Sequence, residues 1–216
     1  MPYEMRLFED ILFGGEEVRF GKPVPRAIYV SAGSVSLDGN DVPLDDGVVL
    51  TDVATVCAGS GGATVWRWEV TSSDPGADTY DHRSALRLAG RIDPTAIADE
   101  LLIRLDSVAF PPGGTALHHT HQGPGIRCLI EGHIRVDTEG RSASYSPGGA
   151  WFESGPEPVF AQASMDVPSR FIRTMVLPRS LLGASSIRYV NEEDRDKPKS
   201  QSYRVFAEAP IALDRV

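Results

Sequence analysis

Short runs of alternating apolar and polar residues, interrupted by glycine or proline, extend along most of this sequence. The chain has 21 glycines and 16 prolines, and the runs between them include Arg26–Leu37, Ala63–Val70, Leu101–Phe110, Gly125–Val136 and Phe171–Leu177. Strands with one buried face alternate in this way, and many short strands separated by turn residues are typical of all-β sandwiches and barrels. The clearest helix signal is Asp93-Pro94, followed by TAIADELL, which predicts a short capped helix.

A weak internal repeat relates the two halves of the chain. A shift of 99 residues lays Ile28–Leu37 over Arg127–Val136 and Gly33 over Gly132. The shared pattern of strand, glycine bend and strand predicts two similar β-units. We expect the first unit at residues 1–71, a linker that can hold a short helix at 72–100, the second unit at 101–190, and a C-terminal tail with a final strand at 191–216.

Charge and cysteine content narrow the possible partners and location. The 30 acidic residues outnumber the 21 basic ones, so we expect no nucleic-acid partner. No apolar run approaches the roughly 18 to 20 residues of a spanning helix, so we expect no membrane partner. Cys57 and Cys128 lie far apart in apolar, strand-like segments, which favours reduced thiols. With an acidic N-terminus that lacks an export signal, these features predict a cytoplasmic protein.

The stretch LHHTHQGPG, residues 117–125, holds three of the five histidines. With Gly113 before it and Gly132 after it, this stretch follows the spacing G(X)5HXH(X)3-4E(X)6G, which is the first motif of the cupin superfamily. The chain resembles that superfamily, except that Gly125 stands where the motif has its glutamate ligand. The second motif, G(X)5PXG(X)2H(X)3N, is recognisable only in residues 145–162, where no histidine occurs.

The resemblance implies a double-stranded β-helix, or jelly roll, with two antiparallel β-barrel units in one chain, a bicupin. It also implies one divalent metal ion, which could be Fe, Mn, Zn or Ni. The 99-residue repeat places Phe20 and Lys22 at the two histidine positions of the first unit. We therefore expect a metal only in the second barrel.

Strand alternation orients the histidines. His119 and His121 project to one face of a strand and His118 to the other, which brings two imidazoles together on the barrel wall. A third ligand must come from elsewhere; the available side chains are Gln122, Glu153, Glu157 and Gln162. We favour Glu153, which would complete a facial triad of two histidines and a carboxylate. Against it, a strict count along the second motif turns Phe152 inward and Glu153 outward. Alternatively, the histidines line a pocket that holds no metal.

By the same alternation Gly125, Arg127 and Leu129 share one face of a strand. If Gly125 takes the inward position that the resemblance implies, Arg127 also points into the second barrel. A buried guanidinium needs a partner, either the carboxylate of a bound ligand or an internal salt bridge to Glu153 or Glu131. The first alternative predicts a pocket for a small organic acid. Its contact residues would be Arg127, Gln122, Trp151 and Leu129. The absent side chain at Gly125 would open space beside the histidines.

Three functions remain open at this point. The first is a metal-dependent enzyme, a dioxygenase, isomerase or lyase, that acts on a small organic acid in the C-terminal barrel. The second is a metal-free protein that binds a ligand or regulates. The third is a structural bicupin. A homodimer formed through sheet edges, which the resemblance makes the expected assembly, is compatible with each of them. Fold resemblance does not choose between these functions.

Overall fold

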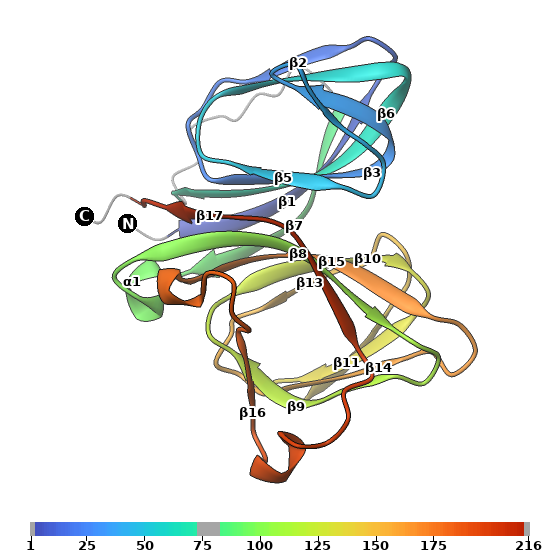
Figure 1. Ribbon diagram of the computed structural model, residues 1–216, viewed down its shortest axis with the longest axis vertical. Helices are drawn as coiled ribbons and strands as arrows, with labels where there is room; N and C mark the ends of the chain where they lie inside the picture. Colours follow the sequence, from blue (N-terminus) through green and yellow to red (C-terminus); the bar gives the residue numbers. More distant parts are fainter. Residues whose placement is uncertain (1–2, 73–82, 214–216) are drawn as a thin grey trace.

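The first barrel is one continuous antiparallel sheet. The computed structural model describes residues 3–72 and 83–213, which are mostly strand (Figure 1). The long strand β6 pairs with β1, β2 and β3, while β3 also pairs with β4 and β5, and β7 pairs with β1. The bounds are β1 (Tyr3–Leu12), β2 (Glu17–Phe20), β3 (Arg26–Leu37), β4 (Asn40–Val42), β5 (Gly47–Leu50), β6 (Ala54–Ser72) and β7 (Arg83–Ile92).

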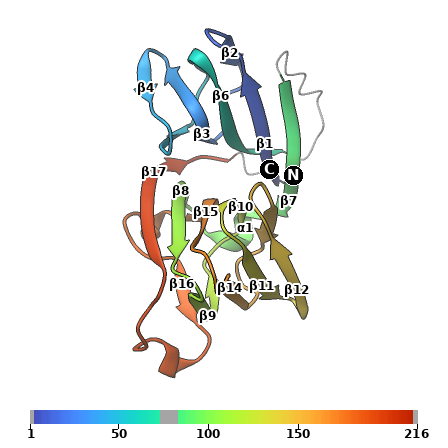
Figure 2. The ribbon, with the colours of Figure 1, turned by 90° about the vertical axis from the view of Figure 1, so that its right-hand side faces the viewer.

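The second barrel consists of two five-stranded sheets. One sheet has the order β13-β10-β15-β8-β17 and the other the order β12-β11-β14-β9-β16. Figure 2 shows this barrel below the first one, with β17 at its edge. The bounds are β8 (Leu101–Phe110), β9 (Thr115–His121), β10 (Gly125–Glu131), β11 (Ile134–Thr138), β12 (Arg141–Tyr145), β13 (Ala150–Glu153), β14 (Val159–Ala163), β15 (Ser169–Pro178), β16 (Ile187–Tyr189) and β17 (Ser202–Ile211).

Apolar residues form a core inside each barrel and a further core between the two. In β6, Trp66 and Trp68 face the second barrel, while their neighbour Val65 faces the interior of the first. In β10, Ile126 and Cys128 join the core between the barrels, while Leu129 lies inside the second barrel. Alternation in these two strands therefore buries residues on both of their faces, which packs the two barrels against each other.

One glycine in each barrel turns the chain at a corner. Gly33 and Gly132, which the sequence repeat superposes, have φ angles of 72° and 76°. A Cβ at Gly33 would lie 2.0 Å from the Gly62 carbonyl oxygen, and one at Gly132 would lie 2.1 Å from the Pro168 carbonyl oxygen. Glycine is therefore required at both positions. The expected fold, two antiparallel β-barrels with a repeated strand-glycine-strand unit, is confirmed.

The connecting segments differ in part from the expected boundaries. The predicted short helix is present as α1 (Pro94–Ile97), where Asp93 accepts a hydrogen bond from the Thr95 amide at 3.0 Å. Residues 83–92, expected in a linker, form β7 and belong to the first sheet; the earlier part of that linker, 73–82, lies outside the described residues. The final strand, β17, pairs with β8 and completes the second barrel.

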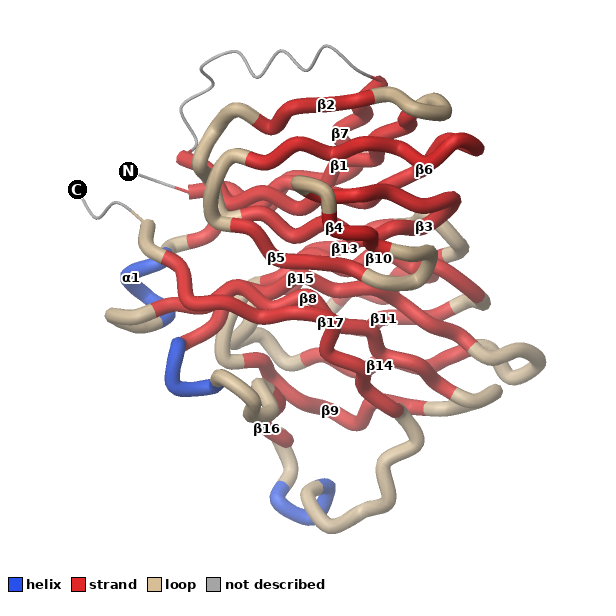
Figure 3. Tube along the Cα trace, turned by 45° about the horizontal axis from the view of Figure 1, so that its top comes forward, coloured by secondary structure: helices blue, strands red, loops and turns tan. Residues whose placement is uncertain are grey.

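Helices make up little of the described chain, as Figure 3 shows. Besides α1 there are two short 3-10 helices, η1 (Arg179–Leu181) and η2 (Glu192–Asp194). Within the described residues no helix is long and apolar enough to span a bilayer. The cysteines are free thiols, and burial raises the pKa of Cys128 to about 12.

Candidate functional site

Two histidines meet inside the second barrel. β9 directs His119 and His121 to the interior, where they are 5% and 7% exposed. Their Nε2 atoms lie 3.2 Å apart and the rings are nearly perpendicular, at 82°. His118 points outward and packs on the Phe160 ring, with centroids 5.2 Å apart. The structure thus has the orientation that alternation predicts.

Hydrogen bonds hold the two imidazoles with their Nε2 atoms facing each other. The Leu117 carbonyl oxygen lies 2.7 Å from His119 Nδ1, and because a carbonyl only accepts, Nδ1 carries the proton of the neutral ring. Ser186 Oγ lies 3.3 Å from His121 Nδ1. Burial lowers the pKa of His119 and lowers that of His121 well below the ordinary value. Both rings are therefore neutral at neutral pH, which is the form that binds metals.

Glu153 faces the histidines from β13. Its Oε1 accepts a hydrogen bond from Trp151 Nε1 at 2.8 Å, and its Oε2 lies 3.5 Å from His121 Nε2. Phe152 points the other way and packs against Gly90 of the first barrel. The strict motif count, which turned Phe152 inward and Glu153 outward, is therefore wrong.

Arg127 is buried beside this carboxylate. Its Nη2 atom lies 2.6 Å from Glu153 Oε2, and its Nη1 donates to the Gly125 carbonyl oxygen at 2.6 Å. Burial lowers the pKa of Arg127 to about 10, and Glu153 opposes that shift. The guanidinium therefore makes one of the two internal salt bridges considered for it, the one to Glu153.

The space at Gly125 is filled. A Cβ at this position would lie 2.5 Å from the Thr174 carbonyl oxygen, 2.8 Å from Met175 Cγ and 3.2 Å from Arg127 Nη1. The expectation that the missing side chain opens room beside the histidines is wrong, because β15 and the arginine occupy that room.

Arg173 and Asp106 form a second buried ion pair in the same barrel. Arg173 Nε and Nη2 donate to the two carboxylate oxygens of Asp106 at 2.9 and 2.7 Å. Sequence reasoning missed both residues, although each is a charged side chain within an apolar strand, LLIRLDSVAF for Asp106 and FIRTMVL for Arg173. Such residues are seldom buried without a partner.

Three hollows meet at His121. The innermost has a volume of about 20 Å³ and is lined by both histidines, Arg127, Glu153 and Arg173. Next to it lies a cavity of about 360 Å³, whose wall includes His121, Arg173, Ser186 and Tyr203. The innermost hollow has room for one ion or water, whereas the second can accept a small molecule.

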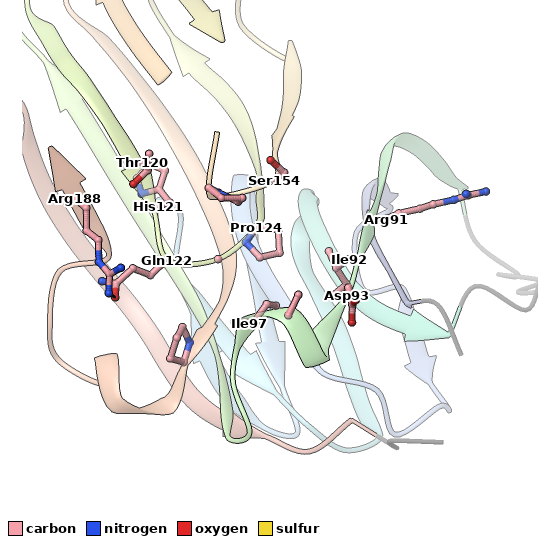
Figure 4. Close-up of a pocket in the computed structure, with 14 residues that line it drawn as sticks. Arg91, Ile92, Asp93, Ile97, Thr120, His121, Gln122, Pro124, Ser154 and Arg188 are labelled. Carbon is pink, nitrogen blue, oxygen red and sulfur yellow. Dashed lines mark hydrogen bonds between the residues drawn. The ribbon is translucent and has the colours of Figure 1, made fainter. Parts of the chain in front are cut away.

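The third hollow is a cleft of about 570 Å³ outside the barrel, between α1 and the end of β9. Gln122 lies here beside Arg188, whose guanidinium donates to its amide oxygen (Figure 4). The other expected contact residues lie deeper. Trp151 lines the innermost hollow and stacks on Tyr145, while Leu129 is fully buried in the apolar core and lines none of the three.

The donor atoms fit a divalent ion in part. Two imidazole ligands at about 2.0–2.1 Å from one ion lie roughly 2.9–3.4 Å apart, so the 3.2 Å between His119 and His121 fits. Glu153 is in reach as a third ligand, but Arg127 holds it. Within the described residues no three His, Cys, Asp or Glu side chains form a complete metal cluster. The two histidines fit a metal as they stand, whereas the carboxylate beside them is engaged by Arg127.

The first barrel has a different interior. Phe20, at the position that the repeat matches to His119, is buried, and Arg26 and Arg67 lie over its ring at 4.7 and 4.8 Å. Arg67 pairs with Asp10 at 2.6 Å, and Glu69 lies 2.7 Å from each guanidinium. The described residues at this place are therefore two arginines and two carboxylates in place of histidines.

Comparisons with known proteins identify the fold. No protein-family model and no curated protein sequence matches the chain. Among solved structures, AerE from Microcystis aeruginosa is similar over 80% of this chain and 88% of its own, at 11% identity and a TM-score of 0.58. Salicylate 1,2-dioxygenase from Pseudoaminobacter salicylatoxidans, with gentisate, is similar over 93% and 72%, at 11% identity and a TM-score of 0.56.

An oxalate decarboxylase is similar over 90% of this chain and 72% of its own, at 13% identity and a TM-score of 0.55. At such identities the likeness concerns the fold alone, and it agrees with the two barrels. The chain therefore shares the fold of these structures, and its two barrels are those that the resemblance to the cupin superfamily predicts.

Proposed function

We propose that the second barrel is the active site of a metal-dependent enzyme that acts on a small organic acid by dioxygenase, isomerase or lyase chemistry. The observation that carries the proposal is the pair of neutral imidazoles, whose Nε2 atoms lie 3.2 Å apart beside a carboxylate. His119, His121 and Glu153 would hold one divalent ion, Fe, Mn, Zn or Ni. A metal bound there would polarise a substrate oxygen or activate dioxygen.

The chain's own residues prepare this site. Leu117 and Ser186 fix the ring orientations through Nδ1, which is how metal-binding histidines are usually held. The barrel wall excludes bulk water, so charges inside interact strongly. Both effects favour a rigid site with one open side, toward the 360 Å³ cavity.

The substrate would occupy that cavity, because the innermost hollow is too small for an organic acid. Arg173 lines both spaces, and Asp106 engages only its Nε and Nη2 atoms. No hydrogen-bond partner of its Nη1 lies among the described residues, so this atom could bind a ligand carboxylate. Arg173 is therefore a better candidate for acid recognition than Arg127, which Glu153 holds. The similar salicylate dioxygenase structure contains gentisate, itself a small organic acid.

The second candidate is a metal-free protein that binds a ligand or regulates. One observation favours it: the salt bridge of 2.6 Å between Arg127 and Glu153 already neutralises the only carboxylate beside the histidines among the described residues. The 360 Å³ cavity would then be a binding pocket without chemistry.

Metal analysis of protein purified without a chelating tag separates the two. The enzyme proposal predicts about one Fe, Mn, Zn or Ni ion per chain, lost in His121→Ala and retained in His118→Ala, whose ring lies on the outer face of the same strand. Metal-free protein in every preparation, also after incubation with each ion, would reject it. The homodimer and the cytoplasmic location stay predictions.

A further inference from the structure

We infer that Arg127 sets the metal affinity of the second barrel, because its guanidinium and a divalent ion compete for the same oxygen, Glu153 Oε2. The inference rests on the proposed metal site and concerns what regulates its occupancy. It assigns to Arg127 a role other than binding a substrate carboxylate.

The contact geometry places the two cations at one atom. Glu153 Oε2 lies 2.6 Å from Arg127 Nη2 and 3.5 Å from His121 Nε2, the atom that would bind the ion. Its other oxygen, Oε1, is occupied by the Trp151 indole at 2.8 Å. An ion bound to both histidines and Oε2 would therefore lie close to the guanidinium, at a place where both side chains are nearly fully buried. Repulsion between them is strong because little water screens it.

The arginine is firmly seated. Its Nη1 donates to the Gly125 carbonyl oxygen at 2.6 Å and lies 3.2 Å from where a Cβ of residue 125 would be. The guanidinium thus lies next to the space that a side chain at position 125 would need. In the motif that this chain resembles, that position supplies a carboxylate ligand. Here the backbone at the same position supplies an acceptor that holds a cation.

The charge balance of the barrel centre also favours competition between Arg127 and an ion. Arg127 pairs with Glu153 and Arg173 with Asp106, so these buried charges cancel. The two histidines are neutral, so the centre carries no net charge without a metal. A divalent ion adds two positive charges that no described residue compensates. Because buried uncompensated charge is costly, removal of Arg127 should favour the ion.

The test is a Zn²⁺ titration of the full chain by calorimetry, with a chelator competing where binding is tight. Arg127→Met should bind Zn²⁺ about 10- to 100-fold more tightly than the wild type, the range in which residues around metal ligands change affinity. The gain should vanish when Glu153→Gln or His121→Ala is added to Arg127→Met. Arg104→Met, which removes a buried arginine paired with Glu208 in the same barrel, should leave the affinity unchanged.

An unchanged or weaker Zn²⁺ affinity of Arg127→Met would overturn the inference and show that the arginine merely positions Glu153. If the wild type still binds one Zn²⁺ through His121, the proposed metal site survives that result. If neither protein binds Zn²⁺, both proposals fail. Should Arg127→Met not fold without metal, Arg127→Lys decides, because its shorter side chain weakens the pair with Glu153 and should raise the affinity above that of the wild type.

Discussion

Mild acid should destabilise the metal-free protein through His121. Burial is the largest cause that lowers the pKa of this imidazole well below the ordinary 6.5, and Arg127 and Arg173 add to it. The unfolded chain restores the ordinary value. Between the two pKa values the unfolded state binds a proton that the folded state does not. The free energy of unfolding therefore falls as the pH falls below 6.5.

The magnitude is largest when the folded histidine stays neutral throughout, and it then follows from the unfolded histidine alone. Between about pH 7.5 and about pH 5.5 the unfolded imidazole goes from roughly 10% to roughly 90% protonated, which lowers the free energy of unfolding by about 1.4 kcal/mol. The contribution of His121 is obtained by subtracting the pH-dependent change in the free energy of unfolding of His121→Gln from that of the wild type, since all other groups titrate in both proteins.

Urea unfolding followed by circular dichroism, with EDTA present, measures this at the two pH values. We expect the wild type to lose about 1.4 kcal/mol more than His121→Gln on acidification. His118→Gln, which changes an exposed ring on the same strand, serves as the control and should behave as the wild type. Equal pH dependence of the wild type and His121→Gln would refute the reasoning, because His121 would then be charged in the folded protein.

Two further changes test the supports of the site. Ser186→Ala removes the hydroxyl 3.3 Å from His121 Nδ1 and should weaken Zn²⁺ binding about 10-fold. It should also lower the free energy of unfolding of the metal-free protein by about 1 kcal/mol, because a buried ring nitrogen loses a hydrogen bond. Equal Zn²⁺ affinity would show that the hydroxyl does not orient the ring. Arg173→Met leaves the buried Asp106 carboxylate without its partner and should lower the free energy of unfolding, measured with urea, by about 3–5 kcal/mol. Adding Asp106→Leu to Arg173→Met should recover most of that loss. A loss under about 1 kcal/mol in the single variant, as for an exposed pair, would contradict the burial of this pair.

Local sequence patterns predicted the fold and part of the site. Alternation has a period of two residues, so the shared face of His119 with His121, and of Arg127 with Gly125, could be predicted without knowing the partner strands, while the resemblance implied that these faces are inward. Gly33 and Gly132 mark corners where backbone from another strand approaches too closely for a side chain. The first signal depends only on neighbouring residues, and the second is visible in the sequence as a glycine even though its cause is a distant strand.

Side chains that depend on a distant partner were harder to place. The sequence left the orientation of Glu153 open, because the facial triad required this side chain to point inward while the strict motif count turned it outward; the structure has it inward. Arg173 and Asp106 were missed because they lie 67 residues apart, and only the pairing of β15 with β8 brings them together. No periodicity within one strand reports such a pair.

Each barrel has a buried arginine–aspartate pair at an equivalent place. Arg67 lies opposite Ile28 in the pairing of β3 with β6, and Arg173 lies opposite Arg127 in the pairing of β10 with β15. Because the 99-residue repeat matches Ile28 to Arg127, Arg67 and Arg173 occupy equivalent places. Each is held by an aspartate of a neighbouring strand. This pair is therefore a feature of both barrels and cannot by itself account for a site in only one.

The two barrels differ at the next inward-facing pair of positions, two residues along the same strands. Arg26 faces Glu69 in the first barrel and forms a buried salt bridge of 2.7 Å, whereas the matching residues of the second barrel, Gly125 and Met175, cannot pair. Without that salt bridge the second barrel has room for the guanidinium of Arg127, which reaches from the next inward position. The second barrel thus keeps two arginines and two carboxylates, as the first does, but its second ion pair, Arg127 with Glu153, lies beside the two histidines of the proposed metal site.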